Sequence, residues 1–371
     1  MRVWNLLLAA GLIATNLWLQ TPSVSAQATG AANDGPQASQ LVERGVEFLR
    51  TAQAPDGSFS KEAGPGITAI VATGLLQNDV PATDPLVAKA LAYLQSFARS
   101  DGAIAAEGSK YSNYETSMAI RAFKAANDKG QYDELLKNAE SYIKQIQWNA
   151  EEGHGESSDF YGGAGYGGHA RPDLSNTTFM LDALEALEVP SDDEAVQRAL
   201  VFVSRCQNLP SKYNETKFPA LNPDGGFYYT IAQGGSSQAG ALPNGGLRSY
   251  GSMGYAGLKS MLYAGVDRDD PRVKAVVEWL QQHYSVDENP GMGDSGLYYY
   301  FHTFAKALSA YGENEFVEKD GDKHDWKQDL VAALAARQKE NGSWANANER
   351  WLEADPNLST GYALLALSYC K

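Results

Sequence analysis

The sequence predicts an all-α fold, an (α/α)6 toroid in which six helix pairs close into a ring. A two-part unit recurs along the chain, and each unit begins with an amphipathic helix that ends near a glutamine. A turn containing glycine and an aromatic or apolar residue follows, and then a second helix rich in Ala, Leu and Gly. Hydrophobic residues make up 43% and charged residues 20% of 371 residues, an ordinary globular composition that can fill one large core.

The residues before the first repeat have the pattern of a secretory signal. Arg2 supplies a positive start, Leu6 to Leu19 is mostly apolar, and small residues around Ala26 form a cleavage site. The apolar stretch is short for a membrane-spanning helix, and polar residues interrupt it. We therefore expect a signal peptide over 1–26, a flexible linker over 27–37 and export to the periplasm or the cell exterior. An uncleaved membrane anchor is the alternative.

The repeat is clearest in the first and last turns. Both contain Gln-x-x-x-Gly-Ser-aromatic, from Gln53 to Phe59 and from Gln338 to Trp344. Weaker copies begin at Gln95 and Gln207, and degenerate copies begin at Gln147 and Gln282. Glycine permits the backbone to reverse at the helix end, the glutamine amide can bond exposed helix-end groups, and the aromatic ring packs on the next pair.

The turns divide the chain into twelve helices. The leading helices are expected near 38–53, 84–98, 131–147, 192–207, 270–283 and 325–338, and the second helices near 67–77, 114–126, 175–188, 250–264, 297–310 and 358–370. The second helices are the more apolar set and predict the inner wall, while the charged leading helices predict the outer wall. Ser or Thr near the inner-helix starts, such as Thr116 and Thr177, is expected to cap free amides. An open repeat array is the alternative, but closure into a ring protects both ends.

This topology separates the two cysteines. Cys206 ends an outer helix, whereas Cys370 ends an inner helix, so the two residues are expected at opposite faces of the barrel. A disulfide cannot span that length.

Charge and motifs exclude several classes of function. The net charge of −15 repels nucleic acid, and no basic stripe compensates for it. Gly291 to Gly296 formally matches a dinucleotide fingerprint, but no strand precedes it. Asp320 to Asp325 lacks the spacing and closing Glu of a calcium loop. We therefore expect no nucleic-acid partner, no metal and no cofactor.

The Gln-x-x-x-Gly-x-Trp/Phe turns resemble the QW motifs of the squalene–hopene cyclase and oxidosqualene cyclase family. The helix pairs are also similar to the prenyltransferase and squalene-oxidase repeat, including protein prenyltransferase β subunits. The resemblance spans residues 38–371 and implies a terpenoid cyclase/prenyltransferase-like toroid. It also implies a small apolar or isoprenoid-like ligand and leaves peripheral membrane contact as an open alternative.

The residues that make that family catalytic are mostly replaced. The cyclases protonate their substrate with Asp-x-Asp-Asp-Thr-Ala, and the corresponding stretch here runs from Asp173 to Thr178, with Ser175 at the position of the proton donor. A hydroxyl cannot protonate an alkene, which needs a poised carboxylic acid. Tyr300 to Thr303 resembles the His-bearing zinc segment of prenyltransferases, but Arg248 to Ser252 lacks the anionic ligands. We expect neither hopene-type cyclisation nor a zinc site.

Three long insertions place the candidate site at one mouth of the barrel. They cover 149–173, 208–249 and 339–357, and each joins an outer helix to the next inner helix. The inner-helix N-termini, with their partial positive charge, point to the same end. The candidate catalytic residues are Asp173 and His302. The candidate substrate-binding residues are Tyr114, Glu115, His169, Arg171, Tyr250, Tyr298, Tyr300, Trp351 and Asp355.

Three kinds of function stay open from the sequence. The first is an exported cyclase relative that acts on an isoprenoid-like or other apolar substrate, and the second is a non-catalytic binding or scaffold toroid. The third is a carbohydrate-active (α/α)6 enzyme, which would need two carboxyls at a set separation. Its candidate carboxyls are Glu115, Asp173, Asp294 and Asp355. The oligomeric state is not predicted.

Overall fold

The computed structural model describes residues 37–168 and 170–371. The predicted signal peptide, all but the last residue of the predicted linker and the candidate residue His169 lie outside the described residues. Within the described residues, no helix has both the length and the apolar character needed to cross a membrane.

In the part of the chain that the structure describes, twelve long helices alternate between two concentric layers. The inner helices are α2 (Gly66–Gln77), α4 (Ser112–Ala125), α6 (Leu174–Ala186), α9 (Gly251–Tyr263), α11 (Leu297–Tyr311) and α13 (Pro356–Leu367). The outer helices are α1 (Ala38–Ala52), α3 (Pro85–Gln95), α5 (Asp133–Gln145), α7 (Glu194–Arg205), α10 (Pro271–Gln282) and α12 (Trp326–Arg337). Short helices η1 (Lys61–Ala63), η2 (Ala150–Glu152), α8 (Phe218–Leu221), η3 (Ala232–Gly234) and η4 (Arg350–Leu352) lie in the connections.

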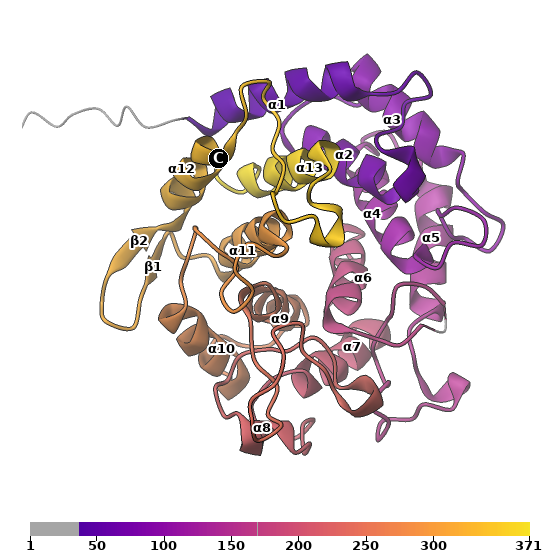
Figure 1. Ribbon diagram of the computed structural model, residues 1–371. Helices are drawn as coiled ribbons and strands as arrows, with labels where there is room; N and C mark the ends of the chain where they lie inside the picture. The colour runs from indigo at the N-terminus through magenta and orange to yellow at the C-terminus, as the bar shows by residue number, and fades with distance from the viewer. Residues whose placement is uncertain (1–36, 169) are drawn as a thin grey trace, which may run out of the picture. The chain divides into compact units, whose positions relative to one another are not determined.

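The inner helices form a closed ring. Each one packs against the next in chain order, and α13 packs against α2, which joins the last repeat to the first. Figure 1 shows these six helices around the centre of the view, with the outer helices surrounding them. The predicted (α/α)6 toroid is therefore confirmed, and the observed helix bounds agree with the expected ones to within three residues.

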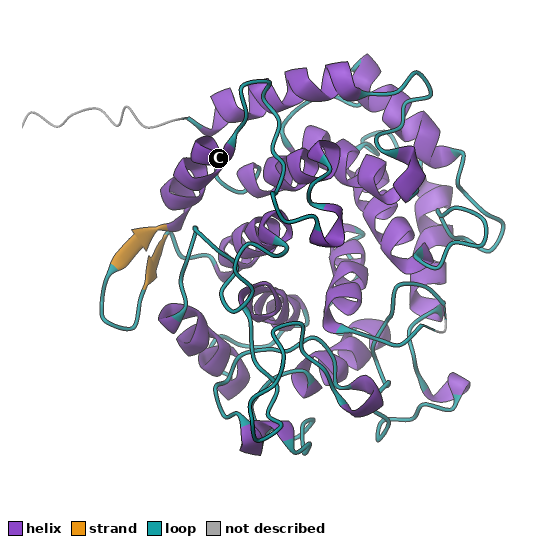
Figure 2. Ribbon diagram, viewed as in Figure 1, coloured by secondary structure: helices purple, strands orange, loops and turns teal. Residues whose placement is uncertain are grey.

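The strands were not expected. The connection between α11 and α12 contains a small antiparallel hairpin, β1 (Glu315–Val317) and β2 (Lys323–Asp325), in which Phe316 pairs with His324. It is the pair of strands coloured orange in Figure 2. Phe316 is buried and stacks on Tyr284, and the amide of Lys319 donates to the carbonyl of Gln281, so the hairpin packs against the end of α10.

Four glutamines of the repeat join consecutive outer helices. Each donates its side-chain N–H groups to two backbone carbonyls, one in its own turn and one in the first turn of the next outer helix. The pairs of acceptors are Gly57 and Leu86 for Gln53, Gly162 and Ala195 for Gln147, Gly225 and Arg272 for Gln207, and Gly342 and Leu41 for Gln338. The bond from Gln338 to Leu41, 3.0 Å long, closes the outer wall of the ring. We call these four joints the seams.

Glycine is required at each seam because the next outer helix approaches the turn closely. A Cβ at Gly342 would lie 2.3 Å from the carbonyl oxygen of Arg44, and one at Gly162 would lie 1.8 Å from that of Arg198. Both glycines also have a positive φ, 86° and 78°, which side chains disfavour. The two remaining copies make no seam of this kind, because Gln95, in a weaker copy, is exposed and Gln282, in a degenerate copy, bonds within its own helix.

The threonines at the inner-helix starts act differently from the prediction. Thr177 accepts a bond from the amide of Ala164 at 3.0 Å, and Thr116 accepts one from the amide of Ile104 at 3.0 Å. These amides belong to the preceding turn, not to the first turn of the inner helix. The threonines therefore fasten each turn onto its inner helix, while the α6 amides are capped by Asp173.

Both cysteines are free thiols. Cys206 lies just after α7 and Cys370 lies after α13 near the C-terminus.

Candidate functional site

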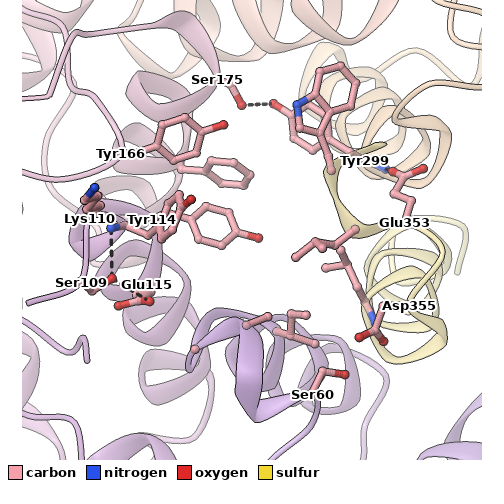
Figure 3. A pocket seen from close by; sticks show the side chains of 18 of the residues that line it. Ser60, Ser109, Lys110, Tyr114, Glu115, Tyr166, Ser175, Tyr299, Glu353 and Asp355 are labelled. Carbon is pink, nitrogen blue, oxygen red and sulfur yellow. Dashed lines mark hydrogen bonds between the residues drawn. The ribbon is translucent and has the colours of Figure 1, made fainter. Parts of the chain in front are cut away.

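A cavity of about 1010 Å³ lies at the mouth of the barrel where the inner helices begin. Its walls come from the starts of α4, α6, α9, α11 and α13 and from the connections before α2, α4 and α13. Nine aromatic residues line it: Tyr111, Tyr114, Tyr166, Phe179, Tyr229, Tyr250, Tyr299, Trp351 and Tyr362. Figure 3 shows several of these rings facing one another across the open space.

Four of these rings form a connected set from four inner helices. Tyr114 lies edge-on to Phe179 with the ring centres 5.0 Å apart, and Phe179 packs on Tyr299 at 5.7 Å. Tyr299 lies 6.0 Å from Tyr362, whose hydroxyl is 3.3 Å from that of Tyr114. Such edge-on contacts stabilise a rigid aromatic surface.

The phenol groups of this set are neutral at ordinary pH. Burial raises the pKa of Tyr114 to about 12, and burial also raises the pKa values of Tyr299 and Tyr362 above their usual range. The walls therefore present uncharged rings with hydroxyl groups that bond to one another. The hydroxyl of Ser175 bonds to that of Tyr299 at 3.1 Å, as the dashed line in Figure 3 marks.

The rim of the cavity carries exposed apolar side chains. Trp351 is 42% exposed and Leu352 is 56% exposed, and both have a left-handed backbone conformation with φ of 57° and 66°. Tyr111, across the mouth, is 53% exposed and packs edge-on against Tyr166. A soluble surface seldom groups such residues unless they meet a ligand or partner.

Three of the carboxylates that line the cavity are held by hydrogen bonds. Glu115 accepts bonds from the Ser109 hydroxyl and the Ala106 amide. Glu353 accepts bonds from the Tyr299 amide at 2.8 Å and from Asn346 at 2.8 Å. The pKa values of both are raised, chiefly by burial.

Glu353 and the third carboxylate, Asp355, stabilise helix starts. Glu353 acts as a cap for α11, whose own preceding residue, Gly296, has no side chain to offer. Asp355 caps α13 through the amides of Asn357 and Leu358.

Five of the predicted binding residues line this cavity: Tyr114, Glu115, Tyr250, Trp351 and Asp355. The other described candidates lie outside its lining. Arg171 lies over the ring of Tyr229, a lining residue, at 5.7 Å. Tyr298 is buried against Phe301, and the hydroxyl of Tyr300 bonds to the carbonyl of Ser285 at 2.7 Å.

The two candidate catalytic residues are buried beside the cavity and do not line it. Asp173 accepts bonds from the amide and the side chain of Asn176, both at 2.8 Å, and so caps α6. Burial raises the pKa of Asp173 from 3.8 to about 6. His302 lies deeper in the ring of inner helices, and its Nε2 is 3.4 Å from Arg121. Their predicted catalytic roles stay predictions.

The sequence did not single out Tyr299, Phe179, Tyr362 or Glu353 as binding residues, although all four line the cavity. Helix phase provides the missing signal for Tyr299. Three consecutive tyrosines, Tyr298 to Tyr300, point about 100° apart, so only one can face the axis of the ring. Tyr299 shares the face of His302, three residues further along, and is the one that faces inward.

Among residues 37–168 and 170–371, no group of three or more His, Cys, Asp or Glu side chains is placed to hold a metal ion.

Comparison with known proteins is consistent with this architecture. The squalene-hopene cyclase C-terminal domain family matches residues 61–232. The predicted resemblance to the terpenoid cyclase family is confirmed. Over these residues the chain is similar to that family. No curated protein matches the sequence.

Solved structures extend the likeness along the chain. The type II terpene cyclase MstE from Scytonema is 14% identical with a TM-score of 0.51, and the match covers 90% of this chain and 98% of that one. A variant of MstE in complex with its substrate, geranylgeranyl dihydroxybenzoate, is 13% identical with a TM-score of 0.51 over 90% and 97% of the two chains. A possible GH105 family member from Salmonella enterica is 9% identical with a TM-score of 0.51 over 95% and 98%. At these identities the likeness concerns the fold alone.

Proposed function

We propose that this protein binds an isoprenoid-like or other apolar molecule in the mouth cavity. The observation that carries the proposal is the connected set of neutral aromatic rings around a space of about 1010 Å³. Aromatic walls with a few convergent polar groups favour a largely apolar ligand, and this volume is at the upper end for small-molecule sites. The MstE complex with a geranylgeranyl compound supports the proposal by analogy of fold.

Alkene protonation of the squalene–hopene type is not part of the proposal. The sequence resemblance aligns Ser175 with the position of the proton donor, and Ser175 faces the cavity, where its hydroxyl bonds to that of Tyr299. Asp173 is engaged with Asn176 as a helix cap. If the bound molecule is transformed, the acid must be another group. Glu115 is the buried carboxyl of the cavity wall that caps no helix end.

Native mass spectrometry of the protein purified from its own cells tests the proposal. A co-purifying prenyl lipid, or added geranylgeraniol retained in a one-to-one complex, is the expected result. The variant Phe179→Ala removes a cavity wall and should weaken retention about tenfold, because a buried aromatic contributes at least about 1.4 kcal/mol to such contacts. The matched control Phe48→Ala, on outer helix α1, should retain the lipid as the parent protein does.

Further assays distinguish this proposal from a carbohydrate-active toroid and distinguish an enzyme from a binding protein. A bound glycan, or release of reducing ends from a glycan panel, would overturn the isoprenoid proposal in favour of a carbohydrate-active toroid. Incubation with geranylgeranyl substrates, followed by mass spectrometry of the products, separates an enzyme from a binding protein. Asp173→Asn and His302→Gln variants then test the two predicted catalytic residues.

We further propose that the chain is exported after cleavage near Ala26, on the strength of the signal pattern in its first residues. Cell fractionation and N-terminal sequencing of the mature protein test this. A chain that keeps Met1 and remains inside the cell would contradict it.

A further inference from the structure

A layer of charged side chains lies beneath the aromatic cavity. Four inner helices each carry a cavity residue and, seven positions later, a charged residue. The pairs are Tyr114 and Arg121, Ser175 and Asp182, Ser252 and Lys259, and Tyr299 and Lys306. Seven residues are two turns of helix, so each charge lies on the same face about 10 Å deeper in the ring. We call these four residues and His302 the charged layer.

Part of this layer neutralises itself. Asp182 accepts bonds from Lys259 at 2.5 Å and from Lys306 at 2.8 Å, and Lys306 also bonds to Glu185 at 2.5 Å. The charges of Lys259, Lys306 and Arg121 together hold the pKa of Asp182 far below its usual range, although its burial alone would raise it. Two lysines therefore face two carboxylates, and their charges balance.

Arg121 is the unbalanced member of the layer. It is only 4% exposed, and among the described residues no carboxylate forms an ion pair with it. Its hydrogen bond is to Nε2 of His302, 3.4 Å away. A buried guanidinium with no carboxylate in direct contact is costly, whereas the same group beside an anion forms strong charge-assisted bonds.

His302 contributes a buried donor without a partner. A guanidinium only donates, so Nε2 of His302 must accept, and the ring proton is placed on Nδ1. Nδ1 is buried and has no hydrogen-bond partner. Burial and the neighbouring Arg121 charge hold the pKa of His302 well below its usual range, so the ring is neutral.

We propose that the charged layer binds an oxyanion, a carboxylate or a phosphate, with Arg121 as its principal contact. The layer adjoins the cavity: the ring of Tyr362, a cavity residue, lies over His302 with the ring centres 6.0 Å apart and the planes 21° apart. The anion is either a free ion or the charged end of the molecule in the cavity. The second source rests on the proposed function.

Isothermal titration with inorganic phosphate tests the site itself. At constant ionic strength, phosphate should bind the wild-type protein and raise its melting temperature above that in chloride, because a ligand stabilises the state that binds it. Arg121→Gln should weaken phosphate binding about tenfold or more, as expected for a charge-assisted bond. The control Arg268→Gln, an exposed arginine paired with Glu313, should leave phosphate binding unchanged.

The stability of the variant separates an anion site from a purely structural arginine. Without phosphate, Arg121→Gln should melt at or above the wild-type temperature, because an uncompensated buried charge is removed. If this variant does not fold, Arg121→Lys keeps the charge but loses the fork of donors, and it should bind phosphate more weakly than the wild type. Absence of phosphate binding by the wild type, or equal binding by Arg121→Gln, would overturn a free-anion site.

A second titration distinguishes the source of the anion. If the charged layer receives the acid end of the cavity ligand, the wild-type protein should bind geranylgeranoic acid about tenfold more tightly than geranylgeraniol. The Arg121→Gln variant should bind the acid and the alcohol equally. Phosphate binding with no preference for the acid assigns the site to a free ion. If the protein binds the alcohol but neither binds phosphate nor prefers the acid, this inference is overturned and the proposed function stands. If the protein binds neither lipid, the result counts against the proposed function.

Discussion

The seams and the mouth are built from the same turns but follow different rules. At each seam a glutamine and a positive-φ glycine recur with the same partners, two carbonyls and one closely packed helix. At the mouth, a few residues away, no fixed pair of partners recurs: the inner helices contribute a mixture of Tyr, Phe and Ser side chains to the cavity. Fixed repetition therefore marks the residues that hold the ring together, and a varied set of side chains marks the cavity.

Changes at the seams should therefore lower stability and spare ligand binding, and changes at the mouth should do the reverse. The following predictions test that separation in order of the expected change in stability.

The largest effect is expected for Gly162→Ala. The new Cβ would meet the carbonyl oxygen of Arg198 at 1.8 Å, and φ is positive. Overpacking and the left-handed backbone together should lower the free energy of unfolding by about 3 kcal/mol, measured by urea denaturation. The control Gly240→Ala has a similar positive φ but open space around it, and should lose about 1 kcal/mol. Equal losses in the two variants would mean that close packing at the seam is unimportant.

The next prediction concerns the change of stability with pH, which should have opposite signs for an aspartate at the mouth and an aspartate between two outer helices. Asp173 at the mouth has a pKa raised to about 6, so between pH 4 and 6 the folded state binds more protons than the unfolded state, and stability falls as pH rises. Asp173→Asn should remove this fall, changing the slope by at most about 1.4 kcal/mol per pH unit.

Asp84 is compared with Asp173. Its carboxylate accepts two hydrogen bonds from Arg50 and so links the start of α3 to α1. The Arg50 guanidinium holds the pKa of Asp84 below its usual value, so its contribution is present above the unfolded pKa and is lost as pH falls through the folded pKa. Asp84→Asn should therefore cost more at pH 7 than at pH 3. Urea midpoints across this range measure both slopes, and slopes of the same sign would contradict the two assignments.

A smaller loss is expected for Gln338→Ala at the closing seam. The substitution leaves the carbonyls of Leu41 and Gly342 without these bonds, which should lower the free energy of unfolding by about 1–2 kcal/mol. Gln95→Ala, in the exposed copy of the motif, should change it by less than about 0.5 kcal/mol. Lipid binding should be the same in both variants.

The smallest effect on stability is expected for Trp351→Ala at the rim. Its side chain is 42% exposed, so the free energy of unfolding should change by less than about 1 kcal/mol. Geranylgeraniol binding should weaken severalfold because the ring lines the cavity. Val317→Ala, another exposed apolar residue but one on the hairpin, should leave binding unchanged. Unchanged binding by Trp351→Ala would show that Trp351 at the rim does not contact the ligand.

The repeated part of the molecule could be predicted from the sequence. The helix pairs, the two layers and the reversal at glycine all follow from periodicity and from the Gln-x-x-x-Gly spacing. The roles of Thr116 and Thr177 could not be assigned, because spacing along one helix does not show which turn lies against it. Gln147, in a degenerate copy, makes a full seam with Gly162. The sequence does not reveal this seam, because an insertion places the glycine fifteen residues after the glutamine.

The site could be predicted only in part, for a physical reason. The sequence locates the mouth, because three insertions and the inner-helix starts must meet there, and Tyr114, Glu115, Tyr250, Trp351 and Asp355 do line it. It does not give the rotation of each inner helix, which decides between Tyr299 and its two neighbours. The short connections at Ser60–Gly64 and Ala106–Tyr111 also line the cavity, but no insertion drew attention to them.

Filling the cavity from inside tests the central claim most directly. Ser175 is partly exposed and lines the open space, so the indole of Ser175→Trp can enter the cavity without displacing the core. Geranylgeraniol binding is measured by titration for the wild type, for Ser175→Trp and for the control Ser141→Trp on the exposed face of α5. The account predicts that Ser175→Trp abolishes binding at an unchanged melting temperature while Ser141→Trp binds as the wild type does. Undiminished binding by a folded Ser175→Trp protein would show that the aromatic cavity is not the ligand site.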